Sequence, residues 1–230
     1  MSQLKERLRT EGFSEEEINK TFSDSRLELY PEIVGRKGKG LDYMGRRFGL
    51  LKKSSLERGQ RILSENREIL EEVERSFGVE KEVVVAILRI ETDFGRKTGK
   101  YPVFNSLFTM AIVENRRSAW AEDELIEFLR LCREQNKDPF SMKGSWAGAF
   151  GICQFIPSSY VGFAVDGNGD GVIDLFDFRD AVASIANYLK AHGWENGRLE
   201  AKRQAIYAYN HCDSYVDAVL AYAKATKERS

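Results

Sequence analysis

Hydrophobic positions along the chain follow a helical rhythm almost throughout. Apolar side chains recur at three- and four-residue intervals, the spacing that places them on one face of an α-helix. This spacing is found over residues 54–75, 79–93, 122–135, 178–192 and 215–227. Ser14 and Glu17 form a capping box that begins a shorter helix, and a charged connection follows at residues 36–40. We therefore expect an all-α, mainly helical fold with at most one or two minor strands.

The composition of the chain argues against several classes of protein. The chain has 230 residues, 42% of them hydrophobic, and a net charge of −1, so it can bury a core and does not resemble a basic nucleic-acid binder. No apolar run approaches the roughly 20 residues that span a bilayer, and the charged first residues do not form a signal peptide. We expect no nucleic-acid partner and no membrane span.

Cysteine and histidine are too sparse for two common kinds of site. The three cysteines lie far apart, which argues against a disulfide framework, and two histidines cannot supply a three-histidine zinc centre. Cys212 directly follows His211, but adjacent residues are poorly placed to act as nucleophile and base. A cysteine hydrolase is therefore a remote alternative.

Glu91 is the first candidate for chemistry. On a helix it shares a face with Val84, Ile87 and Leu88, near the end that Gly95 is predicted to terminate. Burial among apolar side chains and the negative end of the helix dipole both disfavour the charged carboxylate. Both effects raise the pKa of the Glu91 carboxyl, as a general acid at neutral pH requires.

Two structural alternatives accompany this interpretation. Glu91 could turn aside and pair with Arg96 or Lys97, since buried charges are usually paired. Asp93 lies on the opposite side of the helical wheel, where most carboxylates are solvated, and it is the weaker catalytic candidate.

An acidic loop at residues 166–177 matches most of an EF-hand. Oxygen ligands fall at loop positions 1, 3 and 5, glycine stands at position 6, and a backbone carbonyl is available at position 7. The corresponding metal ligands are Asp166, Asn168, Asp170 and the carbonyl of Val172. Hard oxygen donors in this arrangement favour calcium, and we expect a structural calcium ion rather than a solvated acidic turn.

The end of this loop departs from the EF-hand pattern. Position 12 carries Asp177 in place of the usual glutamate, and Asp180 follows three residues later. One of these two aspartates is expected to close the metal site while the other caps the following helix.

Five motifs together resemble the lytic murein transglycosylase B family. They occur in family order at residues 90–96 (IETDFGR), 143–160 (KGSWAGAFGICQFIPSSY), 166–177 (DGNGDGVIDLFD), 181–188 (AVASIANY) and 209–211 (YNH). The resemblance covers roughly residues 75–230. It implies a lysozyme-like catalytic core there, preceded by an accessory α-helical region at residues 1–74.

The resemblance also implies finer organisation and a setting. Residues 111–140 would be a helical insertion packing on the accessory region, and residues 166–180 the EF-hand-like loop. The partner would be the glycan strands of peptidoglycan, which places the protein in the periplasm or cell envelope. We expect a monomer.

The resemblance assigns site residues by position. Glu91 matches the single catalytic acid/base of the family, and Asp180 is favoured over Asp177 as the last calcium ligand. The residues expected to bind substrate are Ser145, Gln154, Phe155, Tyr188, Tyr209 and Tyr215. Each aromatic ring among them is alternatively a core residue, because aromatic side chains dominate protein cores.

The implied activity is that of a lytic transglycosylase acting with one glutamate and with assistance from the substrate. It cleaves the β-1,4 bond between N-acetylmuramic acid and N-acetylglucosamine and leaves a 1,6-anhydro end. A hydrolytic muramidase with Asp93 as second carboxylate is one alternative. A calcium-stabilised glycan-binding module without turnover is the other.

Overall fold

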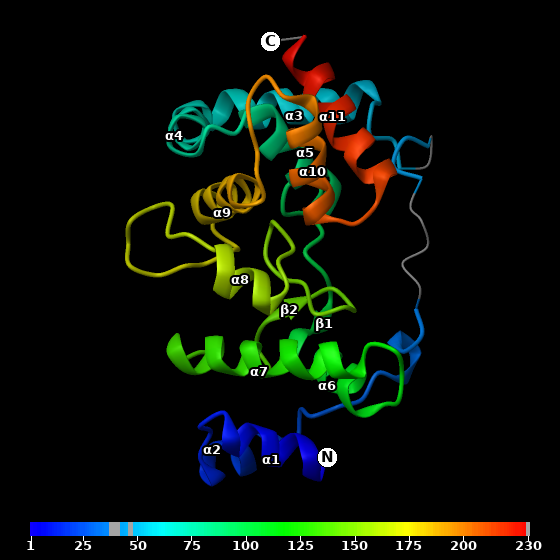
Figure 1. Ribbon diagram of the computed structural model, residues 1–230, viewed down its shortest axis with the longest axis vertical. Helices are drawn as coiled ribbons and strands as arrows, with labels where there is room; N and C mark the ends of the chain where they lie inside the picture. The colour runs from blue at the N-terminus through cyan, green and yellow to red at the C-terminus, as the bar shows by residue number, and fades with distance from the viewer. Residues whose placement is uncertain (37–41, 46–47, 229–230) are drawn as a thin grey trace. The chain divides into compact units, whose positions relative to one another are not determined.

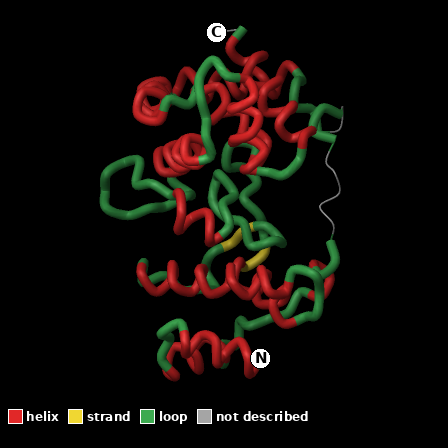
Figure 2. The backbone as a smooth tube through the Cα atoms, viewed as in Figure 1, coloured by secondary structure: helices red, strands yellow, loops and turns green. Residues whose placement is uncertain are grey.

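The computed structural model describes residues 1–36, 42–45 and 48–228. Residues 37–40 of the connection predicted at 36–40 lie outside this set. Within the described residues, helices make up nearly all regular structure and only two very short strands accompany them (Figure 2). The prediction of a mainly helical fold is confirmed.

The elements are labelled in Figure 1. The helices are α1 (Ser2–Thr10), α2 (Glu15–Phe22), α3 (Lys53–Glu65), α4 (Arg67–Phe77), α5 (Lys81–Thr92), α6 (Val103–Ile112), α7 (Ser118–Glu134), α8 (Pro157–Phe163), α9 (Phe178–Ala191), α10 (Leu199–Tyr209) and α11 (Asp213–Lys227), with a 3₁₀ turn, η1, at Pro31–Ile33. Strands β1 (Tyr101–Pro102) and β2 (Lys143–Gly144) pair antiparallel, with Tyr101 opposite Gly144.

Side-chain caps begin two of the helices as predicted. The Ser14 hydroxyl accepts the Glu17 backbone N–H, and the Glu17 carboxylate accepts the Ser14 N–H, which completes the capping box of α2. Asp177 caps α9 by accepting the backbone N–H groups of Arg179 and Asp180. Asp177 is thus the aspartate that caps the helix after the acidic loop.

One predicted helix needs correction, and one helix of the structure was not predicted. The single helix predicted at residues 54–75 is two helices, α3 and α4, which meet at Asn66. The Asn66 side-chain amide donates to the Ile62 carbonyl, and this bond competes with helix continuation. Helix α6 is not predicted by spacing because every residue from Val103 to Met110 is buried, so the helix has no polar face.

Chain contacts divide the molecule into two units, each built from three segments. Unit 1 contains Met1–Lys37, Thr98–Phe150 and Gln154–Gly162. Unit 2 contains Gly38–Lys97, Gly151–Cys153 and Phe163–Ser230. The boundary predicted near residue 75 falls within unit 2, and the assignment of residues 1–74 as an accessory region stays a prediction.

Unit 1 is built around the pair of helices α6 and α7. The rings of Phe104 and Phe108 on α6 stack 5.9 Å apart, and Phe22 of α2 packs on both. Arg7 of α1 forms ion pairs with Glu122 and Asp123 of α7, at 3.3 and 2.5 Å. The N-terminal helices therefore pack on the helix that lies within the predicted insertion at 111–140.

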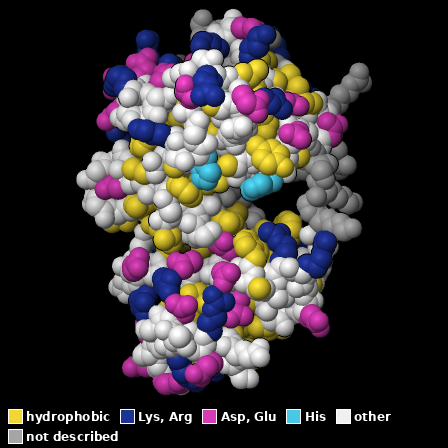
Figure 3. Space-filling model, in the orientation of Figure 1, with side chains coloured by type: hydrophobic (Ala, Val, Ile, Leu, Met, Phe, Trp, Pro, Cys, Tyr) yellow, Lys and Arg dark blue, Asp and Glu magenta, His cyan; other side chains and the backbone are white. Residues whose placement is uncertain are grey.

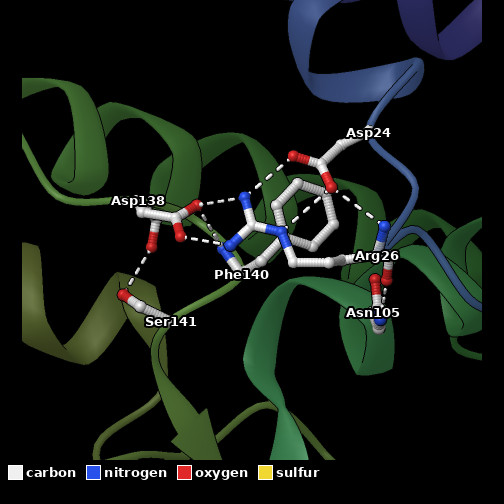
Figure 4. A network of polar contacts seen from close by, with 6 residues as sticks. All are labelled: Asp24, Arg26, Asn105, Asp138, Phe140 and Ser141. Atoms are coloured by element: carbon white, nitrogen blue, oxygen red, sulfur yellow. Dashed lines mark hydrogen bonds and ion pairs between the residues drawn. The ribbon is translucent and has the colours of Figure 1, made fainter.

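Arg26 joins three segments of unit 1 (Figure 4). Its guanidinium pairs with Asp24 and Asp138 and lies 4.8 Å from the centre of the Phe140 ring. Its carbonyl accepts the side-chain amide of Asn105 on α6. This arginine fixes the chain that follows α2 against α6 and the loop after α7.

Unit 2 has α5 at its centre. Helices α3, α4, α9 and α11 all contact α5 (Figure 1), and Val84, Ile87 and Leu88 on α5 are fully buried. The Tyr222 hydroxyl of α11 donates to the Ser55 carbonyl of α3 at 2.6 Å. The most apolar helix of the unit therefore holds the segment that carries Glu91.

The surface carries both signs of charge, as expected from the net charge of −1. Acidic and basic side chains are interspersed over the face shown in Figure 3, with hydrophobic side chains between them. Among the described residues, no helix combines the length and the apolar character needed to cross a membrane.

Candidate active site

Glu91 lies in the last turn of α5, one residue before the helix ends at Thr92. Glu91 as a whole residue is half-buried. The Tyr215 hydroxyl of α11 donates a hydrogen bond of 2.6 Å to Oε1 of Glu91. Arg96, which the sequence offered as an alternative partner, instead contacts Asp93 at 3.6 Å.

Burial raises the pKa of the Glu91 carboxyl to about 7, against the opposing effect of the hydrogen bond from Tyr215. Tyr215 itself is fully buried, and burial together with the Glu91 charge raises the pKa of its hydroxyl well above the ordinary value. The tyrosine therefore keeps its proton and acts as a donor. Near neutral pH, Glu91 is available in both its protonated and ionised forms.

Four tyrosines extend from Glu91 through unit 2. Tyr215 contacts Tyr43 edge-on at 5.5 Å and lies nearly parallel to Tyr209 at 6.5 Å. Tyr209 in turn contacts Tyr188 at 5.0 Å. Sequence reasoning named three of these rings and missed Tyr43, whose pKa is raised to about 12 by burial and by the Glu91 charge.

The hydroxyls of two of these rings are anchored to backbone. Tyr209 donates to the carbonyl of Cys153 at 2.6 Å, and Tyr188 donates to the carbonyl of Ala208 at 2.8 Å. The structure thus brings Glu91, Tyr188, Tyr209 and Tyr215 together in unit 2 with fixed ring orientations.

The chain after α5 adopts an unusual backbone conformation. Asp93, Phe94 and Gly95 all have positive φ, at 52°, 62° and 82°, and two of the three are residues for which this conformation is costly. The Thr92 hydroxyl accepts the Gly95 N–H and donates to the Ile152 carbonyl at 2.8 Å. These bonds hold the turn that directly follows Glu91.

Asp93 is not solvated, so that expectation is wrong. Its side chain is 13% exposed and contacts Arg58 at 3.0 Å, Arg89 at 3.5 Å and Arg96 at 3.6 Å. The helical wheel places Asp93 away from the apolar face of α5 but does not show that α3 brings an arginine to meet it. This carboxylate is engaged by three cations.

The remaining predicted substrate residues belong to unit 1. Ser145 Oγ accepts the backbone N–H groups of Ala147 and Ala149, at 3.2 and 3.0 Å. Gln154 has a φ of 55° and donates through Nε2 to the Thr98 carbonyl, and Phe155 is 2% exposed. Their contact with substrate stays a prediction.

The acidic loop is folded by its own side chains. Asp166 accepts the N–H groups of Gly169 and Gly171, Asn168 accepts that of Asp170, and Asp170 accepts that of Val172. Among residues 1–36, 42–45 and 48–228, no group of three or more His, Cys, Asp and Glu side chains is placed to hold a metal ion. The predicted ligand set, which includes an amide and a carbonyl, stays a prediction.

Asp180 is fully buried beneath this loop. Its two carboxylate oxygens accept the N–H groups of Gly167 and Asp174, at 2.9 and 2.7 Å. Since Asp177 caps α9, Asp180 is the aspartate that faces the loop.

The adjacent His211 and Cys212 have separate partners. Sγ of Cys212 lies 3.1 Å from the Ser214 hydroxyl, a contact that lowers the pKa of the thiol, whereas the His211 ring packs on Tyr207. This arrangement does not support a nucleophile–base pair.

A sequence model of the transglycosylase SLT domain matches residues 1–203 of this chain. The chain belongs to this family. The match confirms the resemblance drawn from the motifs, and the lysozyme-like helical fold is that of the SLT family.

The chain is also similar in sequence to an individual lytic transglycosylase. The membrane-bound lytic murein transglycosylase B of Escherichia coli (strain K12) is 46% identical over 121 residues. This match covers 53% of the present chain and 34% of the relative, so the chain spans about a third of that protein.

Solved structures of family members superimpose on almost the whole chain. The E. coli lytic transglycosylase SLT35, solved in complex with bulgecin A and with calcium, matches with a TM-score of 0.88 at 25% identity, covering 98% of this chain and 91% of its own. SltB3 from Pseudomonas aeruginosa, in complex with NAG-anhNAM-pentapeptide, matches with a TM-score of 0.87 at 25% identity, covering 98% and 78%.

Proposed function

We propose that this chain is a peptidoglycan lytic transglycosylase with Glu91 as its only catalytic acid/base. The observation that carries the proposal is the Glu91 carboxyl, which is hydrogen-bonded to Tyr215 and has a pKa raised by burial to about 7. Membership of the SLT family supports the reaction class. The anhydro sugar bound to SltB3 supports the cyclic product.

In the first step, protonated Glu91 donates to the oxygen that links N-acetylmuramic acid to N-acetylglucosamine. The bond from C1 to this oxygen breaks, and its electron pair leaves with the oxygen. The carbonyl of the substrate's own 2-acetamido group stabilises the positive charge that develops at C1. A second carboxylate is not needed, as in other substrate-assisted glycosidases.

In the second step, the Glu91 carboxylate removes the proton from the C6 hydroxyl of the same muramic acid. O6 bonds to C1, which removes the positive charge that the acetamido carbonyl had stabilised, and the 1,6-anhydro ring closes without water. Glu91 is protonated again and ready for another cycle. A pKa near 7 suits a group that must give and accept a proton at neutral pH.

Tyr215 and Ser145 have distinct proposed roles. Because Tyr215 engages Oε1 of Glu91, the proton to be donated is carried by Oε2, and Tyr215 acts as a positioning residue. The two backbone bonds accepted by Ser145 Oγ leave its own O–H to donate, which supports Ser145 as the donor to the acetamido group. Gln154, Phe155 and Tyr209 are proposed to contact the sugars.

Product analysis tests this function. Digests of purified glycan strands should contain 1,6-anhydromuramic acid ends by mass spectrometry, and Glu91→Gln should abolish them while strand binding remains. Reducing muramic acid ends would instead identify a hydrolytic muramidase. In the two-carboxylate form of that activity, the nearby candidate for the second carboxylate is Asp93, which is held by arginines. No cleavage by the intact protein would favour a glycan-binding module.

We also propose a structural calcium ion in the acidic loop. Asp166, Asn168, Asp170, the Val172 carbonyl and Asp180 would hold it. The fit rests on an all-oxygen donor set and on N–H bonds that already fold the loop around its carboxylates. The calcium complex of SLT35 supports this choice of ion. Bound calcium would hold the loop against the start of α9.

Thermal denaturation tests the calcium site. Calcium should raise Tm and a chelator should lower it, by mass action on the folded state. Asp180→Asn should lose this response, whereas Asp177→Asn should keep it, because asparagine also caps helices. A response lost in the Asp177 variant instead would reassign the last ligand, and the absence of any response would refute the site.

The setting of the enzyme follows from its proposed substrate. Peptidoglycan strands place the protein in the periplasm or cell envelope, and the membrane-bound relative in E. coli supports this setting. A monomer is proposed, and sedimentation analysis tests it.

A further inference from the structure

A hollow of about 480 Å³ lies between α10 and α11, in unit 2. We call it the α10 hollow. Its lining includes Glu200, Arg203, Gln204, Tyr207, His211 and Asp213. None of these side chains has a part in the chemistry proposed for Glu91.

The lining residues on α10 form one continuous face. Glu200, Arg203, Gln204 and Tyr207 follow each other at intervals of three, one and three residues, the spacing of a single helix face. This face runs for about 10 Å along the helix, and His211 continues it past the helix end. With a volume of about 480 Å³, the hollow has room for a sugar ring and not only for an ion.

Tyr207 supplies a flat apolar surface in the α10 hollow. Tyr207 is 41% exposed, in contrast to the buried Tyr43, Tyr188 and Tyr215. The His211 ring contacts it edge-on at 5.4 Å and fixes its orientation. An aromatic ring that is exposed and oriented by a neighbour is suited to stack against the C–H face of a sugar ring.

Polar side chains around Tyr207 match the hydroxyl and amide groups of a sugar. Gln204 offers both a donor and an acceptor, and Glu200 and Asp213 offer carboxylates. Arg203 is paired with Asp217 of α11 at 2.7 Å, so its charge is already balanced. Two carboxylates and one engaged guanidinium favour a neutral hydroxylated ligand over an anionic one.

The α10 hollow is separate from the tyrosines near Glu91. Tyr207 and Tyr209 are two positions apart, about 200° around the helix, and Tyr209 faces Tyr188 and Tyr215. A sugar at Tyr207 would therefore lie on the other side of α10. One helix would contact substrate on both faces.

We propose that the α10 hollow is a secondary glycan-binding subsite that takes an N-acetylhexosamine ring on the face of Tyr207. The inference rests on the proposed function, since it assumes that glycan strands are the substrate. Binding there retains a strand on the enzyme at a point away from the reacting bond. It increases affinity for long strands without changing the chemistry at Glu91.

Binding measurements on the full chain carrying Glu91→Gln test this subsite without turnover. The probe is a preparation of long glycan strands stripped of stem peptides, titrated in a calorimeter. Tyr207→Ala should weaken binding at least about fivefold, the size expected for the loss of an aromatic contact worth about 1 kcal/mol. Tyr207→Phe keeps the platform and should bind within about twofold of the parent.

Leu199→Ala is the matched control, because Leu199 is an exposed apolar residue on the same helix that does not line the hollow. It should bind like the parent. Equal binding by Tyr207→Ala and the parent would overturn the proposal. So would a loss confined to strands that still carry stem peptides, which would identify a peptide site.

The cleavage assay and the binding comparison test different claims. If the protein with intact Glu91 leaves strands uncleaved, the catalytic assignment fails. The binding comparison at Tyr207 does not depend on cleavage, and it decides the subsite separately.

Discussion

Replacement of Glu91 by glutamine should stabilise the protein at alkaline pH. The carboxyl has a pKa of about 7 in the folded chain and 4.5 ordinarily, a difference that corresponds to about 3 kcal/mol. Above pH 7 the folded protein bears this cost of holding a charged carboxylate. Glutamine removes the charge and keeps an oxygen to accept the bond from Tyr215.

The raised pKa of Glu91 determines how the stability of the protein changes with pH. A pKa raised by folding means that the folded chain binds the proton more tightly, so stability is fully present below pH 4.5 and is lost as pH rises through 7. The gain from Glu91→Gln should therefore approach about 3 kcal/mol at pH 8 and vanish at pH 4. Partial exposure of the residue makes this figure a ceiling.

Thermal denaturation at the two pH values measures the effect. For a chain of this length, about 3 kcal/mol corresponds to a rise in Tm of up to about 10 °C. Glu68→Gln, at an exposed position on α4, is the control and should show no such dependence on pH. A Glu91→Gln protein with unchanged or lower Tm at pH 8, or with the same gain at pH 4, would refute the reasoning.

Three further substitutions test the site and its support. Tyr215→Phe removes the donor that stabilises the Glu91 carboxylate, so the alkaline limb of the kcat/KM profile should move to higher pH; Tyr222→Phe, also on α11, should leave that limb in place. Glu124→Ala leaves the backbone N–H and the hydroxyl of Ser158 in α8 without an acceptor. It should therefore lower the free energy of unfolding by about 1–3 kcal/mol, as measured by denaturant titration. Gly151→Ala should lower Tm, because φ is 78° and the new Cβ would lie 2.5 Å from a neighbouring side chain; an unchanged Tm would contradict this close approach.

Local signals in the sequence predicted the secondary structure around Glu91 and at the start of α9. The apolar run ahead of Glu91 gave its helix and its position near the helix end, and Asp177 was one of two residues expected to cap α9. Both depend on neighbours within about one or two helical turns. The spacing of apolar and capping residues contains that information directly.

Contacts between distant segments could not be predicted in the same way. Tyr43 meets Tyr215 across most of the chain, and no local pattern relates the two. Asp93 was expected in solvent because its helical wheel position omits Arg58, which comes from α3. Helix α6 could not be predicted because its burial on all sides leaves no alternation of apolar and polar residues in the sequence.

The hydrogen bond between Tyr215 and Glu91 joins residues 124 positions apart, and this separation has a consequence for synthesis. During translation the acid leaves the ribosome long before its tyrosine partner is made. A nascent or prematurely terminated chain that stops short of α11 carries Glu91 without the group that orients it. Glu91 therefore acquires its hydrogen-bond donor only after α11 has been synthesised.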